Sequence, residues 1–206
     1  MVQLIDSVQI EGHLNELFGS IGNATSTLNE KVNALLYFES IVVNSNVSNR
    51  LINSVFMNLL VKMLKTVKTP QIRVRVCSAI GLLVRHSTVI ENDVAESEVC
   101  SQLVDVLMRD KNEKVRRKAV AALGEYMFYA ATQLDDDQAD PCWEIRDDAI
   151  NAIIKSLRVD INSNTNETSS DETVIFYAVK TLENITAQSN SAGGRFATVE
   201  STNYLL

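Results

Sequence analysis

Few side chains in this sequence stand at spacings that support catalysis or metal binding. The two histidines, His13 and His86, have no cysteine or carboxylate at the spacing of a zinc site or of a Cys–His nucleophile. Cys77 and Cys100 fall on apolar helical positions, where a thiol packs as a small buried side chain. We therefore expect no catalytic residue, no metal site, no cofactor and no enzymatic activity in this chain.

An acidic stretch, "DDDQAD", occupies residues 135–140 and has the carboxylates that a calcium loop needs. An EF-hand loop also requires glycine at its sixth position and glutamate at its twelfth. Counted from Asp135, those positions hold Asp140 and Arg146. The stretch is therefore interpreted as an acidic surface loop.

The basic triplet Arg116–Lys118 belongs to a longer stretch of positive charge. Residues 62–118 hold 12 Lys and Arg against 7 Asp and Glu, a net charge of +5, although the whole chain carries −7. Such a strip suits an acidic partner. The negative total makes nucleic acid an unfavourable partner, but a nucleic-acid-binding repeat module that uses the strip 62–118 is the alternative that this pattern leaves open.

The apolar residues recur at steps of three and four, which is the pattern of an amphipathic helix. Residues 72–81 superimpose on residues 115–124 without a gap, 43 positions apart, so that Gly81 falls on Gly124. A third copy begins at Val174, and a weaker one begins at Val32. With only 2 Pro and 7 Gly in 206 residues, a fold of many short strands is disfavoured.

Partner helices are expected between these copies, at about 5–19, 48–66, 95–109 and 145–158. A helical unit that recurs every ~40 residues predicts an all-α solenoid of HEAT or armadillo type, because one hairpin cannot bury its apolar face alone. We expect one domain, 1–206, with about four stacked helical hairpins. The expected repeats cover residues 1–45, 46–89, 93–134 and 143–189, and a further helix begins in 192–206.

The basic side chains of the repeat helices divide into two groups. Arg73 and Arg116 hold equivalent positions, which predicts a structural role such as pairing with an acid in the preceding turn or the neighbouring repeat. Other basic residues of these helices lie off the apolar stripe, where they form either a plain solvated face or a partner-binding surface. The candidate partner-binding residues are Arg75, Lys114, Arg117 and Lys118.

The later half carries a more specific pattern. It contains Ala122-Leu123-Gly124-Glu125, Phe128-Tyr129 with Thr132-Gln133, Trp143, Tyr177-Ala178 with Lys180-Thr181, and Glu183-Asn184-Ile185. Over roughly residues 110–200 this pattern resembles the non-catalytic, C-terminal repeat region of the Fused-type and fourth Unc-51-like kinases. The resemblance implies a scaffold for protein–protein interaction within a kinase or pseudokinase that is linked to microtubules, cilia or cell division.

The kinase machinery itself is absent from this sequence. There is no G-x-G-x-x-G loop, no His-Arg-Asp and no Asp-Phe-Gly motif. We expect a fragment of a longer protein, and the tubulin surface is the acidic partner that the resemblance suggests. The oligomeric state does not follow from the sequence.

Three features predict a cytoplasmic protein without a membrane partner. The three cysteines show no C-x-x-C spacing, the N-terminal segment lacks the pattern of a signal peptide, and no apolar run approaches ~20 residues. Within the cytoplasm, the resemblance implies the cytoskeleton or the cilium.

Overall fold

The computed structural model describes residues 19, 21–23, 25–134, 141–158 and 171–197. These residues form helices and contain no strand. The first helices are α2 (Leu28–Ile41), α3 (Ser45–Ile52), α4 (Val55–Thr66), α5 (Pro70–His86), α6 (Asn92–Glu96) and α7 (Val99–Arg109). They are followed by α8 (Glu113–Leu134), the short 3-10 helix η1 (Pro141–Trp143), α9 (Asp147–Ser156), α10 (Glu172–Gln188) and α11 (Asn190–Phe196).

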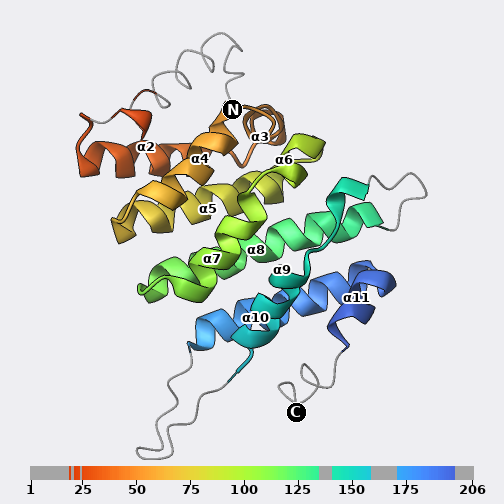
Figure 1. Ribbon diagram of the computed structural model, residues 1–206. Helices are drawn as coiled ribbons and strands as arrows, with labels where there is room; N and C mark the ends of the chain where they lie inside the picture. Colours follow the sequence, from red (N-terminus) through yellow and green to blue (C-terminus); the bar gives the residue numbers. More distant parts are fainter. Residues whose placement is uncertain (1–18, 20, 24, 135–140, 159–170, 198–206) are drawn as a thin grey trace, which may run out of the picture.

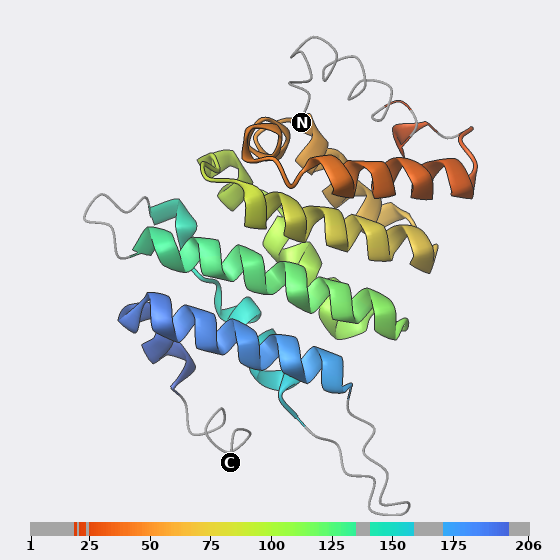
Figure 2. The ribbon, with the colours of Figure 1, turned by 180° about the vertical axis from the view of Figure 1, so that it is seen from behind.

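The longer helices stack in two layers. Helices α2, α5, α8 and α10 lie side by side in one layer, which faces the viewer in Figure 2, and each contacts the next. Helices α4, α7 and α9 form the other layer, which lies in front in Figure 1. Both layers share one continuous apolar core that extends from Ile21 to Phe196. The predicted α-solenoid is therefore confirmed.

A short helix precedes each helix of the second layer, so the repeating unit contains three helices where the sequence pattern predicted two. Helix α3 precedes α4, α6 precedes α7, and η1 precedes α9. The single helix expected at 48–66 is wrong, because the chain turns at Asn53 and Ser54. The hydroxyl of Ser54 accepts a hydrogen bond from the amide of Phe56 and so begins a new helix.

The other expected helices have somewhat different boundaries in the structure. Helix α7 begins four residues after the expected start at 95, and the expected helix 145–158 is α9. The helix expected at 5–19 lies almost wholly outside the described residues. The copy expected from Val32 is helix α2, which begins earlier, at Leu28, because Thr27 and Glu30 form a capping box.

The register of the repeat is confirmed by burial. Val115, Ala119 and Leu123 are buried in α8, and so are Val174, Ala178 and Leu182, which the alignment places on them in α10. Gly81 and Gly124 allow close helix contact, because a Cβ atom added at Gly81 would lie 3.1 Å from the Cα atom of Ala122. At Gly124 it would lie 2.3 Å from the Oγ1 atom of Thr181. The alignment places Thr181 on Ala122, so both junctions use the same pair of positions.

No helix in the part of the chain that the structure describes is long and apolar enough to cross a membrane.

Candidate protein-binding surface

Arg73 and Arg116 hold the turns that precede the long helices. The Arg73 Nε atom donates to Asp110 Oδ2 at 2.6 Å, and its guanidinium also donates to the carbonyls of Leu64 and Val67. Arg116 donates in the equivalent way to the carbonyl of Asp110 at 2.9 Å. The Arg73 and Asp110 side chains are only 11 % and 12 % exposed. The predicted structural role of both arginines is confirmed, and Asp110 links the two.

Arg117 has an ion pair that the helical pattern does not reveal. Its Nε atom lies 2.9 Å from both carboxylate oxygens of Asp171, the residue that caps the N-terminus of α10. Its guanidinium also lies 3.5 Å from Glu113. The Arg117 side chain is 38 % exposed and that of Asp171 only 11 %. Arg117 therefore holds α8 against α10, and its predicted role in partner binding competes with this contact.

Arg75 pairs with Glu39 on the neighbouring helix α2, with 3.1 Å between Nη1 and Oε2. Burial raises the pKa of Glu39, and the positive charges of Arg75 and Lys118 only partly oppose that rise. The other carboxylate oxygen of Glu39 is buried and accepts no hydrogen bond from the described residues. Arg75 and Lys118 thus place positive charge beside a desolvated acid at the α2–α5 junction.

Lys114 is an exposed basic residue of α8. It is exposed at the start of α8 and makes no hydrogen bond or ion pair within the described residues. The same holds for Lys111, two residues before α8. Lys111 lies within the predicted strip 62–118. It was not among the candidate partner-binding residues, because these were chosen by their position on helix faces and Lys111 precedes the helix. Together they are the basic residues most open to a partner near these helix starts.

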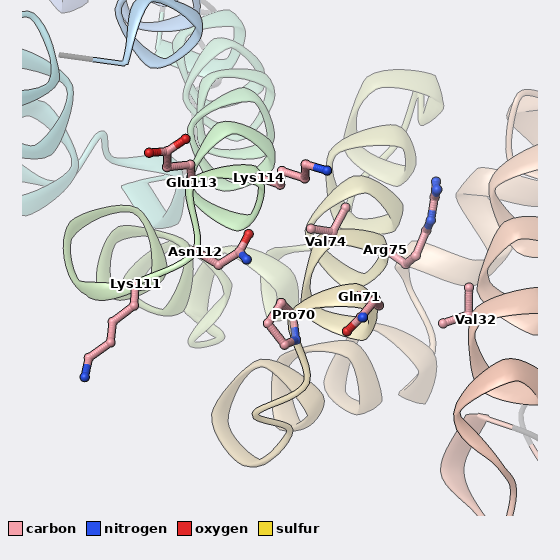
Figure 3. A pocket seen from close by; sticks show the side chains of 9 residues that line it. All are labelled: Val32, Pro70, Gln71, Val74, Arg75, Lys111, Asn112, Glu113 and Lys114. Carbon is pink, nitrogen blue, oxygen red and sulfur yellow. The ribbon is translucent and has the colours of Figure 1, made fainter. Parts of the chain in front are cut away.

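A hollow of about 710 Å³ lies where α5 and α8 begin, beside α2 (Figure 3). Its walls combine apolar side chains with an excess of positive ones. The lining residues are Val32, Pro70, Gln71, Val74, Arg75, Lys111, Asn112, Glu113 and Lys114. Lys114 extends from α8 toward α5, whereas Arg75 lies on the side of α2 (Figure 3). The hollow therefore brings together two of the four candidate residues, while Arg117 and Lys118 do not line it.

The thiols and imidazole are not arranged for chemistry in the described residues. Cys77 and Cys100 are buried, and burial raises the pKa of each thiol to about 12, so both stay protonated and unreactive near neutral pH. His86 lies at the end of α5. Within the described ranges, no group of three His, Cys, Asp or Glu side chains could hold a metal ion. His13 and the acidic stretch 135–140 lie outside the described residues.

The aromatic residues that carry the kinase resemblance are largely packing residues. Trp143 packs on Tyr129 with ring centroids 4.8 Å apart, and its indole N–H donates to Asn92 Oδ1 at 3.1 Å. The hydroxyl of Tyr129 accepts a hydrogen bond from the amide of Ile90 at 3.0 Å. These contacts join α8 to the short helices α6 and η1.

Stacked three-helix units with one continuous core define an armadillo-type repeat protein, and solved structures agree with that class. A designed armadillo repeat protein matches 96 % of this chain and 83 % of its own, with a TM-score of 0.64 and 20 % identity. An engineered protein matches 93 % of this chain and 70 % of its own, with a TM-score of 0.66 and 16 % identity. At these identities the likeness establishes the fold alone.

The sequence relatives of this chain are kinase-related proteins. The serine/threonine-protein kinase RUNKEL of Arabidopsis thaliana is 36 % identical over 201 residues, which is 92 % of this chain. The serine/threonine-protein kinase ULK4 of Mus musculus is 24 % identical over 180 residues, or 86 % of this chain. The chain spans 14 % and 13 % of the length of these two proteins. No protein-family model matches the chain. The resemblance to kinases of this type is confirmed, with a repeat region as the matching part.

Proposed function

We propose that this chain is a non-catalytic helical-repeat scaffold that binds an acidic protein partner, as one part of a larger kinase or pseudokinase. The observation that carries the proposal is the hollow at the starts of α5 and α8, where Lys111 and Lys114 have no acidic partner among the described residues. Stacked repeats present an extended surface that suits a protein ligand. Unpaired cations on that surface increase the rate of encounter with an acidic partner.

The cellular setting that we propose is suggested by the family resemblance of the sequence. Proteins of the fourth Unc-51-like kinase type suggest a role at microtubules, at cilia or in cell division, and the cytoplasm is the compartment in which this chain would then act. The acidic surface of tubulin is the first partner to test. The expected repeats 1–45, 46–89, 93–134 and 143–189 would form one binding unit in the longer protein.

Microtubule cosedimentation tests this proposal directly. The probe is the 206-residue chain mixed with stabilised microtubules at low and at physiological salt. Charge reversal by Lys111→Glu with Lys114→Glu should weaken binding about tenfold, because it removes two cations that a partner would meet. Arg117 is left unchanged, since Arg117→Glu would also break the contact with Asp171.

A matched control carries the same change of charge elsewhere. Lys62 on α4 and Lys155 on α9 are exposed in the other helix layer. Lys62→Glu with Lys155→Glu should leave cosedimentation close to that of the wild type. Equal losses in the two double variants would mean that only net charge matters. A gel-shift assay with duplex DNA at moderate salt tests the nucleic-acid alternative, and tight binding there would replace the proposal.

A further inference from the structure

The hollow lies at a junction that differs from the next one at a single position of the repeat. In the register of the repeat, Val74 of α5 occupies the position of Arg117 in α8. Arg117 spans the next junction and reaches Asp171, the residue just before α10. The residue before α8 that is equivalent to Asp171 is Asn112. Its side-chain oxygen accepts a hydrogen bond from the amide of Val115 at 3.3 Å. Because Val74 is too short to reach Asn112, the space that an arginine fills at the α8–α10 junction stays open here.

The open space has an apolar wall and a basic rim. Val32, Pro70 and Val74 present hydrocarbon to it from α2 and α5 (Figure 3). Lys114 and Arg75 border it on opposite sides. Helices α5 and α8 both begin at this place, and the positive ends of their dipoles add to the attraction for an anion. The one carboxylate in the lining, Glu113, is already close to Arg117.

A second hollow of about 410 Å³ adjoins the first and shares Pro70, Lys111 and Asn112 with it. Its two acids are already engaged, since Asp105 pairs with Arg109 at 2.9 Å and Asp110 pairs with Arg73. Lys68 and Lys111 supply its remaining charge, and neither lies in an ion pair among the described residues. A chain that crosses Pro70 from one hollow to the other would therefore meet unpaired cations at both ends.

Resting on the proposed function, we propose that these two hollows form one binding site for an extended acidic segment of a partner protein. The segment places an apolar side chain against Val32, Pro70 and Val74, and its flanking carboxylates lie on Lys111 and Lys114. The apolar contact supplies specificity, because it is made only by a segment that carries an apolar side chain at this point. The carboxylates supply attraction that falls with salt.

Fluorescence anisotropy with labelled peptides tests the site. The first peptide has one Leu flanked on both sides by three Asp or Glu residues, the second replaces that Leu with Gly, and the third replaces every acid with its amide. The wild-type chain should bind the first peptide about tenfold more tightly than either of the others, because each lacks one half of the interaction. Equal affinity for the Leu and Gly peptides would overturn the apolar part of the site.

The decisive variant copies the closed junction into the open one. Val74→Arg with Asn112→Asp adds one positive and one negative charge, so the net charge is unchanged while the side chains fill the hollow. We expect the affinity for the Leu peptide to fall about tenfold or more, because the apolar wall is covered. Unchanged affinity in the folded variant would overturn the site and leave the proposed function intact, with the partner bound elsewhere.

A second pair of variants keeps the test independent of folding in the first. Lys111→Gln with Lys114→Gln changes only exposed side chains and should lower the affinity for the Leu peptide, whereas Lys62→Gln with Lys155→Gln should not. Equal losses in both pairs would overturn the site in favour of unspecific attraction. Peptide binding that follows these expectations without any microtubule cosedimentation would keep the site and reject tubulin as the partner.

Discussion

The α5–α8 and α8–α10 junctions share one helical register but differ in how their edges are closed. At the α8–α10 junction, Arg117 of the first helix contacts the cap residue of the second, Asp171. At the α5–α8 junction, Val74 leaves that contact unmade and a hollow remains. The ion pair across this junction is made instead by Arg73, one position before Val74 in the helix, with Asp110. The two junctions thus differ at one position of a shared register, which holds Val74 in α5 and Arg117 in α8.

The largest difference in stability is expected between alanine substitutions of Arg73, at the α5–α8 junction, and Arg117, at the α8–α10 junction. Arg73→Ala should lower the free energy of unfolding by about 3 kcal/mol, because Arg73 and Asp110 are both mostly buried and the guanidinium also binds the carbonyls of Leu64 and Val67. Arg117→Ala should cost about 1 kcal/mol or less, since the Arg117 side chain is 38 % exposed. Urea denaturation followed by circular dichroism measures both. Arg85→Ala, at a more exposed pair with Glu125, serves as the near-neutral control.

Equal losses for Arg73→Ala and Arg117→Ala would contradict this ranking and would mean that the two contacts are equally important for stacking.

The second largest difference between the junctions is expected for alanine substitutions at the two contact glycines. Gly124→Ala should destabilise the chain by about 2 kcal/mol, because the new methyl group overlaps the buried Thr181 hydroxyl. Gly81→Ala meets Ala122 at a less severe distance, and its cost should stay within about 1 kcal/mol, since alanine also favours the helix. Thermal unfolding of both variants measures the difference.

A second substitution checks the cause of that difference. Adding Thr181→Ala to Gly124→Ala removes the hydroxyl that the new methyl group overlaps, and it should restore part of the lost stability. A double variant no more stable than Gly124→Ala would show that the clash lies elsewhere.

Filling the hollow at the α5–α8 junction should change the free energy of unfolding by less than the glycine substitutions, and it should increase stability. Val74→Arg with Asn112→Asp should raise the free energy of unfolding by about 0.5 kcal/mol, the usual value of a partly exposed ion pair. The gain should shrink at high salt, where such a pair is screened. A loss of stability at every salt concentration would mean that the two junctions are not equivalent in backbone geometry.

The smallest effect concerns the α2–α5 junction, where Glu39 is partly desolvated. Burial raises its pKa above the ordinary value of 4.5, so the folded chain binds this proton more tightly than the unfolded chain. Its contribution to stability is therefore present below that ordinary value and is lost as the pH rises through the folded pKa. Glu39→Gln should gain stability relative to the wild type over that rise, as measured by urea denaturation at several pH values. The prediction would be contradicted if the free energies of unfolding of the wild type and Glu39→Gln changed with pH in parallel.

The helical repeat was predictable because it depends on local spacing. Apolar residues at steps of three and four identify the helix faces, and the match of 72–81 with 115–124 fixes which positions meet when units stack. The short helices α3 and α6 were missed, because they have only eight and five residues. Periodicity cannot detect so short an element.

The amino-acid sequence by itself therefore determined the solenoid, its register and the structural role of Arg73 and Arg116. Only the tertiary structure decided which cations remain available, since Arg73 meets Asp110 across 37 residues and Arg117 meets Asp171 across 54. Helical spacing places Lys114 and Arg117 alike off the apolar stripe and cannot tell them apart. Stacking brings Asp171 to Arg117, whereas Lys111 and Lys114 have no acidic partner among the described residues. This difference locates the candidate binding site.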